Sequence, residues 1–166
     1  MEAAKVDALL EDLCQTVGGK WLLLGGSVGP LESGGNRALE ELDLLSISHP
    51  KLSAVDAQAE LVIAATRIGL DPKTLNTSAR FFLEGIKNWQ NQILVSRRGP
   101  KGIIYKPSLT LFTVLKLKRG TELDMQDIEQ AVKNEGVDAF AQTQFLQMAD
   151  PDTIKLFRSI RGRFDL

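Results

Sequence analysis

A short apolar run that ends in two glycines and a serine limits the folds open to this chain more than any other feature. The run is Trp21-Leu22-Leu23-Leu24, and Gly25-Gly26-Ser27 follows it directly. A few consecutive apolar residues bounded by glycines are typical of a buried strand. Glycines at the end of a strand allow a sharp turn and a close approach of a ligand to the backbone. The sequence therefore predicts a strand over Lys20–Leu24 that leads into a tight turn.

Ser27 is suited to cap a short helix over Val28–Glu32 after that turn. The first N–H groups of such a helix have no partner within it, so they would face a phosphate. A plain strand-to-helix turn that binds nothing is the alternative interpretation of the same residues.

A second strand is predicted within residues 37–48, centred on Glu41–Ile47, and it carries two carboxylates. Side chains alternate between the faces of a strand, so Glu41 and Asp43 would share one face while Leu42 and Leu44 point into the core. Two like charges on one face repel each other, and a divalent cation relieves that repulsion. Mg²⁺ prefers one or two carboxylates together with phosphate oxygens. This pattern indicates a phosphate-and-metal site, and a merely solvated face is the alternative.

Composition favours one globular domain in a reducing compartment. The 166 residues are 43% apolar and 25% charged, with a net charge of −1. A near-neutral chain has no global field that would attract nucleic acid or a membrane surface. Cys14 is the single cysteine, so it forms no internal disulfide and is expected to pack in the core. We therefore expect a cytoplasmic protein without a membrane segment.

Apolar spacing, caps and turn residues predict the other elements. His49 is expected in a surface loop. The helix over Ser53–Gly69 is expected to bury Val55 among its apolar residues. Asp124 is expected to cap one later helix, with Asp127 at its third position. The remaining predicted elements are a helix over Ala3–Thr16, a helical piece from Asn76 or Thr77, strands over Asn91–Ser96 and Ile103–Lys106 around a basic loop at 97–102, and helices over Leu109–Lys118, Met125–Asn134, Val137–Met148 and Asp152–Arg161.

Three segments in this order resemble the nucleotidyltransferase superfamily: Gly25-Gly26-Ser27, Arg37, and Glu41-Leu42-Asp43-Leu44-Leu45. More narrowly, the chain is similar to small bacterial nucleotidyltransferase-like proteins related to the toxins of abortive-infection and toxin–antitoxin pairs. The stretch Leu75-Asn76-Thr77-Ser78-Ala79 supports the narrower resemblance. So does Leu115-Lys116-Leu117 followed by Asp124-Met125-Gln126-Asp127-Ile128. The resemblance covers roughly residues 20–135.

The resemblance implies an α/β (α+β) fold with a mixed sheet flanked by helices. Residues 1–166 would form a single domain, with a core at about 20–106 and a helical part at about 107–166. It also implies transfer of a nucleotide from a nucleoside triphosphate to a protein or RNA acceptor, with Mg²⁺ or Mn²⁺ as cofactor. An antitoxin-like protein is implied as a further partner.

The resemblance assigns roles to particular residues. Gly25, Gly26, Ser27 and Arg37 would bind the nucleotide. Glu41 and Asp43 would hold the metal and act in catalysis. Lys116 would lie near the phosphates or keep a helix in register.

This chain departs from the family pattern in several features. Glu41 and Leu39 stand where the family has Asp and a small hydroxyl residue, and the strands predicted at 91–96 and 103–106 contain no acid. The alternative function is therefore a catalytically degenerate fold that binds a nucleotide or a protein partner. An RNA-binding module, based on Arg97, Arg98, Lys101 and the C-terminal arginines, is the weakest alternative.

Overall fold

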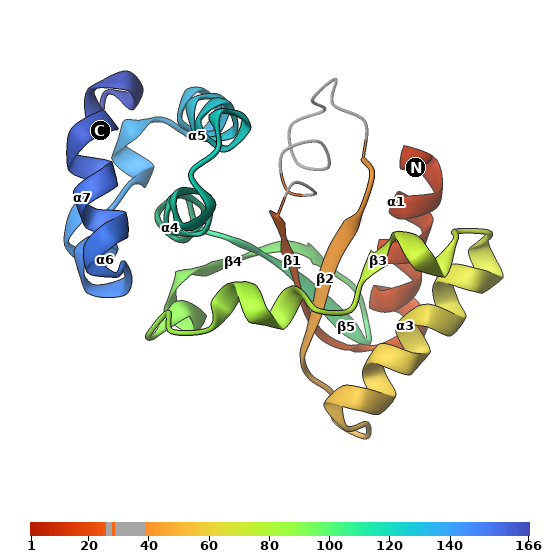
Figure 1. The fold of residues 1–166 in the computed structure, drawn as a ribbon. Coiled ribbons are helices and arrows are strands. Elements are labelled where there is room, and N and C mark those ends of the chain that lie inside the picture. The colour runs from red at the N-terminus through yellow and green to blue at the C-terminus, as the bar shows by residue number, and fades with distance from the viewer. Residues whose placement is uncertain (26–27, 29–38) are drawn as a thin grey trace. The chain divides into compact units, whose positions relative to one another are not determined.

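The computed structural model describes residues 1–25, 28 and 39–166, and its strands form a five-stranded mixed sheet. This confirms the predicted α/β (α+β) class. The chain forms two units (Figure 1): a sheet unit of residues 1–81 and 94–106, and a helical unit of residues 82–93 and 107–166. The helix predicted at Val28–Glu32, and with it Gly26, Ser27 and Arg37, lies largely outside the described residues.

The strand order is β3-β2-β1-β5-β4. β1 pairs antiparallel with β2 and parallel with β5, and β2 pairs parallel with β3. The side chains of Trp21–Leu24 in β1 are all fully buried. This burial explains why the strand is continuously apolar rather than alternating. The bounds are β1 Gly19–Leu24, β2 Leu42–Ser48, β3 Leu75–Asn76, β4 Ile93–Arg98 and β5 Gly102–Pro107.

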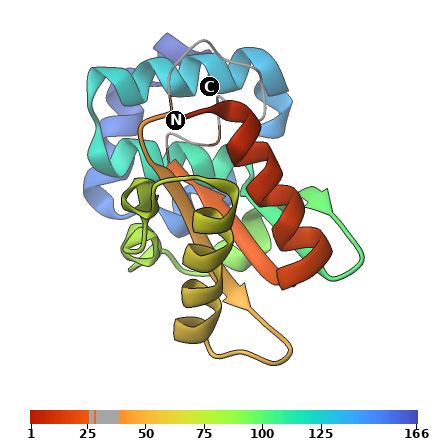
Figure 2. The same cartoon turned by 90° about the vertical axis from the view of Figure 1, so that its right-hand side faces the viewer.

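Two helices lie side by side over one face of the sheet (Figure 2). They are α1, Ala3–Asp12, which continues as a π-helical turn over Leu13–Val17, and α3, Ala54–Ile68. Ser53 caps α3 by accepting a hydrogen bond from the N–H of Asp56, and Gly69 ends the helix in the left-handed conformation. Both ends agree with the sequence prediction. Val55, however, was expected to be buried and is 79% exposed, because it lies in the first turn on the outer side of the helix.

The turn between β4 and β5 packs closely against the start of the π-helical turn. The N–H of Lys101 donates to the carbonyl of Cys14 at 3.0 Å. A methyl group at Gly99 would stand 2.7 Å from both Cβ and the carbonyl oxygen of Cys14, so only glycine fits. Cys14 is buried as expected, and this burial raises the pKa of its thiol.

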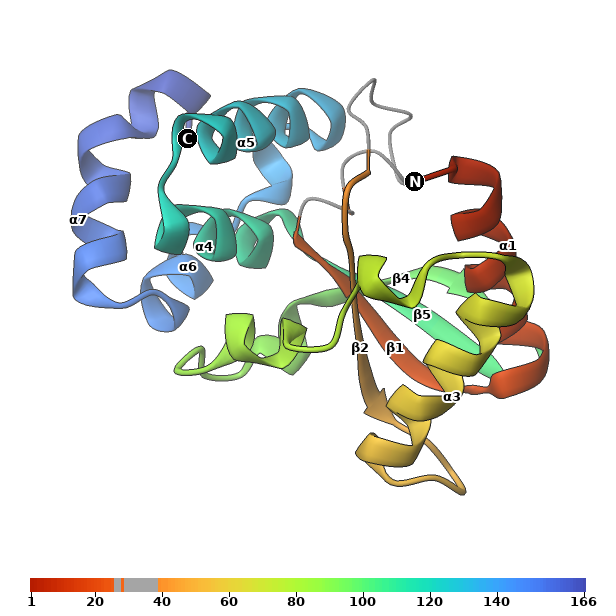
Figure 3. The ribbon, with the colours of Figure 1, turned by 45° about the vertical axis from the view of Figure 1, so that its right-hand side comes forward.

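The helical unit is built around α4, which contacts α5, α6 and α7 (Figure 3). Ser108 caps α4, accepting a hydrogen bond from the N–H of Leu111. Phe140, Phe145 and Phe157 form an aromatic cluster with ring centroids 4.4 to 5.4 Å apart. The bounds are α4 Leu109–Arg119, α5 Glu122–Glu135, α6 Gln142–Met148 and α7 Pro151–Ile160, with 3-10 turns at Pro72–Thr74, Ala79–Leu83, Trp89–Gln92, Val137–Ala139 and Arg161–Phe164.

Three further local predictions were wrong. The segment from Asn76 is the end of β3 followed by a 3-10 turn rather than a helix. The helix predicted at Val137–Met148 is interrupted at Phe140, which joins the aromatic cluster. The third error, the cap of α5, concerns the site described below. His49 lies in a loop as predicted; it is half-buried, with one ring nitrogen 2.9 Å from the carbonyl of Val17 and the other accepting two backbone N–H bonds.

We expect Ser53→Ala to lower the free energy of unfolding by about 1 kcal/mol, because it removes the acceptor for an otherwise unpaired N–H of α3. Ser159→Ala is the matched control, since Ser159 lies exposed inside the last turn of α7. That change should alter stability by no more than about 0.5 kcal/mol. Urea denaturation measures both, and equal effects of the two substitutions would contradict the capping role.

Candidate functional site

Gly25 and the carboxylate of Asp43 meet where β1 ends. Asp43 lies opposite Leu24 in the β1–β2 ladder, so its side chain reaches the residue that follows β1. Gly25 has φ +63°, and a methyl group there would stand 1.9 Å from Oδ2 of Asp43. Position 25 therefore requires glycine for two reasons: the backbone is left-handed, and the Asp43 carboxylate fills the space that a side chain would need. The structure thus brings together two of the residues proposed from the sequence.

Asn76 of β3 holds the carboxylate of Asp43 in place. Its side-chain N–H donates to Oδ1 of Asp43 at 2.7 Å, and the two residues are register partners in the β2–β3 ladder. The side-chain oxygen of Asn76, Oδ1, accepts a hydrogen bond from the backbone N–H of Ser78 at 2.9 Å. Because this bond orients the side-chain amide, its NH₂ group faces Asp43. Asp43 is only 7% exposed. A buried carboxylate needs such a donor, because burial without hydrogen bonds is costly.

Glu41 occupies a different environment from Asp43. It precedes the first residue of β2 and is exposed, whereas Asp43 is buried within the strand. The leucines at 42 and 44 are buried as expected. Within residues 1–25, 28 and 39–166, no group of three or more His, Cys, Asp and Glu side chains is placed to hold a metal ion. A metal here would therefore rely on Asp43 and Glu41 with oxygens from a ligand, an arrangement that Mg²⁺ accepts.

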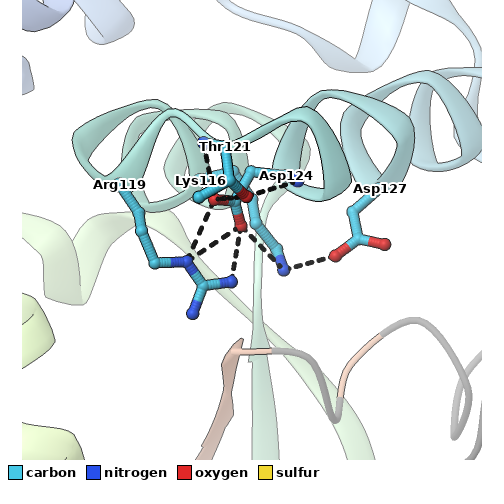
Figure 4. Close-up of polar contacts among 5 residues, drawn as sticks. All are labelled: Lys116, Arg119, Thr121, Asp124 and Asp127. Carbon is cyan, nitrogen blue, oxygen red and sulfur yellow. Dashed lines mark hydrogen bonds and ion pairs between the residues drawn. The ribbon is translucent and has the colours of Figure 1, made fainter.

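Lys116 belongs to the helical unit, where it joins α4 to α5 (Figure 4). Its ammonium is 2.6 Å from Oδ2 of Asp127 and 3.7 Å from Oδ1 of Asp124. The Lys116 side chain is only 4% exposed, so the two carboxylates balance a charge that has left bulk water. These contacts join α4 to α5, and both roles that the resemblance offered for Lys116 stay predictions.

Asp124 is the centre of the same network. Its carboxylate accepts two-pronged hydrogen bonds from Arg119 and further bonds from the N–H and hydroxyl of Thr121. Burial by itself would raise the pKa of Asp124. The hydrogen bonds from Arg119 and Thr121 outweigh that effect and lower the pKa from 3.8 to about 2.

The cap of α5 was assigned to the wrong residue. Thr121, not Asp124, is the N-cap, and Asp124 is the third helical residue of a reciprocal capping box. Asp127 is consequently not the third residue and instead binds Lys116. The pattern Thr-Glu-Leu-Asp at 121–124 carries this signal, since a threonine followed three residues later by an acid predicts such a box.

Asn76 is the site residue that the sequence reasoning did not assign. The stretch Leu75–Ala79 was noted for its resemblance to the family but received no role in the site. A lone asparagine gives no sign that it will face a carboxylate 33 residues earlier in the chain. The parallel pairing of β2 with β3 creates that contact.

Comparison with known proteins adds no family to this description. No protein-family model, curated protein or solved structure matches the chain. No helix in the described part of the chain is long and apolar enough to cross a bilayer.

We expect Gly25→Ala to destabilise the protein more than Gly85→Ala. Both glycines have positive φ, 63° and 77°, but nothing lies within 4 Å of a methyl group at Gly85. The control therefore carries only the backbone strain of about 1–2 kcal/mol, and Gly25→Ala adds a clash with Asp43 of about 1–3 kcal/mol. Chemical denaturation measures both variants. If the clash is real, adding Asp43→Ala to Gly25→Ala recovers part of the loss, and strict additivity would contradict it.

We expect the Asp124 network to weaken in acid. Because the pKa of Asp124 is about 2 in the folded protein and 3.8 as its ordinary value, its contribution is complete above pH 4 and is lost as the pH falls through 2. The contribution of Asp124 to the free energy of unfolding is about 2 kcal/mol, from about 1.4 kcal/mol per pKa unit. Urea denaturation of the unmodified protein and of Asp124→Asn, from pH 2 to pH 7, measures this contribution. The gap in stability between the two proteins should close below pH 4, and a constant gap would contradict the assignment.

Proposed function

We propose that this chain is a nucleotidyltransferase-like protein that binds a nucleoside triphosphate with Mg²⁺ beside Gly25 and Asp43. The observation that carries the proposal is the contact between the Asp43 carboxylate and Gly25, held by Asn76. A carboxylate fixed beside a glycine turn supports binding of a metal and a phosphate chain in the same place. The resemblance adds Gly26, Ser27 and Arg37 as nucleotide-binding residues, which lie outside the described residues.

The donors available fit a metal held by two carboxylates. Asp43 would supply a buried, oriented oxygen and Glu41 an exposed one, while the triphosphate oxygens complete the set. Bound Mg²⁺ would neutralise the charge of the triphosphate. Asn76 acts indirectly by keeping the Asp43 carboxylate in one orientation. It is a positioning residue, because it contacts Asp43 through a hydrogen bond rather than the ligand.

The same contacts favour binding over nucleotide transfer. One oxygen of Asp43 already accepts a hydrogen bond from Asn76. Glu41 precedes β2 and is exposed, whereas Asp43 is buried within the strand, so the two carboxylates are not equivalent. Transfer requires groups held to the geometry of the reacting atoms, and misplacement costs rate steeply. We therefore propose a nucleotide-binding or interaction protein that retains the transferase-like arrangement.

We expect Mg²⁺ and ATP together to raise the melting temperature by several degrees. A ligand at one hundred times its Kd stabilises the folded state by about 2.7 kcal/mol. Asp43→Asn keeps the shape of the side chain and the acceptor for Asn76 but removes the charge, so the Mg²⁺-dependent part of the shift should disappear. Differential scanning fluorimetry with each of the four nucleoside triphosphates, with and without Mg²⁺, measures this.

Asp138→Asn is the matched control, because Asp138 is exposed in the 3-10 turn before α6. Its nucleotide-dependent shift should equal that of the unmodified protein. An equal shift for Asp43→Asn, or no shift with any triphosphate, would contradict the proposal.

Transfer of the nucleotide to a protein or RNA acceptor is the second candidate function. The exposed carboxylate of Glu41, two positions before Asp43, favours it as a further metal ligand. Incubation with α-labelled triphosphates, Mg²⁺ or Mn²⁺ and cell lysate tests it. Label that appears on a lysate component and is lost in both Glu41→Gln and Asp43→Asn would establish transfer in place of binding alone.

A further inference from the structure

Four exposed cations gather at the end of the sheet away from Asp43. Lys20 is the second residue of β1 and pairs with Ser48 at the end of β2 and with Ile103 of β5. Arg98 ends β4, Lys101 immediately precedes β5, and Lys51 follows the end of β2. We call these four residues the basic end. Lys20 and Leu24 are separated by roughly 13 Å, at about 3.3 Å per strand residue, so the basic end is distinct from the Gly25–Asp43 site.

Backbone contacts join the three segments that carry these cations. The N–H of Gly19 donates to the carbonyl of Lys101 at 3.2 Å. The His49 ring lies 2.9 Å from the carbonyl of Val17 and accepts from the N–H of Lys51. The start of β1, the end of β2 and the β4–β5 turn therefore form one continuous surface, although residues 20, 51 and 98–101 are far apart in sequence.

Three arginines elsewhere in the protein are paired with carboxylates. Arg97, next to Arg98, binds Asp7 and Glu11 of α1. Arg67 pairs with Asp12, and Arg163 pairs with Glu122 and Glu129. The four residues of the basic end, by contrast, are all exposed and make no ion pair with any of the described residues. The chain as a whole has a net charge of −1, so the positive charge of the basic end is a local feature of the surface.

We propose that the basic end binds the phosphodiester backbone of a nucleic acid. Several separate cations across a surface match the repeated charges of such a backbone. A membrane surface fits less well, because binding to it also requires apolar side chains that enter the lipid. None of the large apolar side chains exposed in the described residues belongs to segments 18–20, 48–52 or 98–102. This inference does not depend on nucleotide binding beside Asp43.

The test is binding of a fluorescent single-stranded RNA of about twenty nucleotides, followed by fluorescence anisotropy from 25 to 300 mM salt. Four neutralised phosphates give a slope of about −3 in log K against log salt, at about 0.7 per contact for single strands. The variant Lys20→Glu, Arg98→Glu, Lys101→Glu should lose affinity on the order of tenfold or more and should flatten this slope. Glutamine at the same three positions is the milder variant, and circular dichroism verifies that each variant is folded.

The control carries the same change of charge elsewhere. Lys87→Glu, Lys133→Glu, Lys155→Glu alters three exposed lysines of the helical unit. It should bind RNA as the unmodified protein does. Equal loss in both triple variants would overturn the proposal, because net charge would then explain it.

Binding measurements with other polyanions show which kind of nucleic acid the basic end recognises. A DNA strand and a DNA duplex of the same length show whether the backbone alone suffices or RNA is preferred, and binding to any of the three supports the site. Absence of binding to all three at 25 mM salt overturns it. Retention on vesicles with anionic phospholipid, without retention of nucleic acid, overturns it in favour of a membrane surface.

Discussion

The complete burial of Trp21–Leu24 in β1 is the constraint on which the sheet unit depends. These residues lie between β2 and β5 with no exposed surface, so polar groups are confined to the two ends of the strand. At one end Gly25 follows the strand and lies beside Asp43. At the other end Lys20 is the second residue of the strand, next to the β4–β5 turn and the end of β2. One apolar strand thereby separates an acidic end from a basic end of the same sheet.

The two units stabilise buried carboxylates in different ways. Asp43 accepts a hydrogen bond from the neutral amide of Asn76. Asp124 is surrounded by the charged groups of Arg119 and Lys116 and by Thr121. Breaking a buried ion pair leaves an uncompensated charge, which is strongly destabilising, so the second arrangement suits a structural junction between α4 and α5. The position of Asp43 beside Gly25, at the end of β1, makes it the better candidate for binding.

Features set by neighbouring residues could be predicted from the sequence. The buried strand, the caps at Ser53 and Ser108, and the end of α3 at Gly69 all follow from local spacing and backbone chemistry. The exposure of Val55 could not be predicted, because an apolar residue in a first helical turn points inward only if another element covers it. The break at Phe140 arises from packing with Phe145 and Phe157, which lie on α6 and α7.

The sequence by itself determined the α/β class, the central strand and the identity of Asp43 as the acid that follows on the next strand. Only the tertiary structure decided which groups surround that acid. Asn76 reaches Asp43 because β3 pairs with β2, and Arg97 but not Arg98 is neutralised because α1 presents Asp7 and Glu11 to it. Periodicity and capping depend on residues within a turn or two of one another. Pairing of strands and of distant charges depends on the whole chain, so local patterns do not specify it.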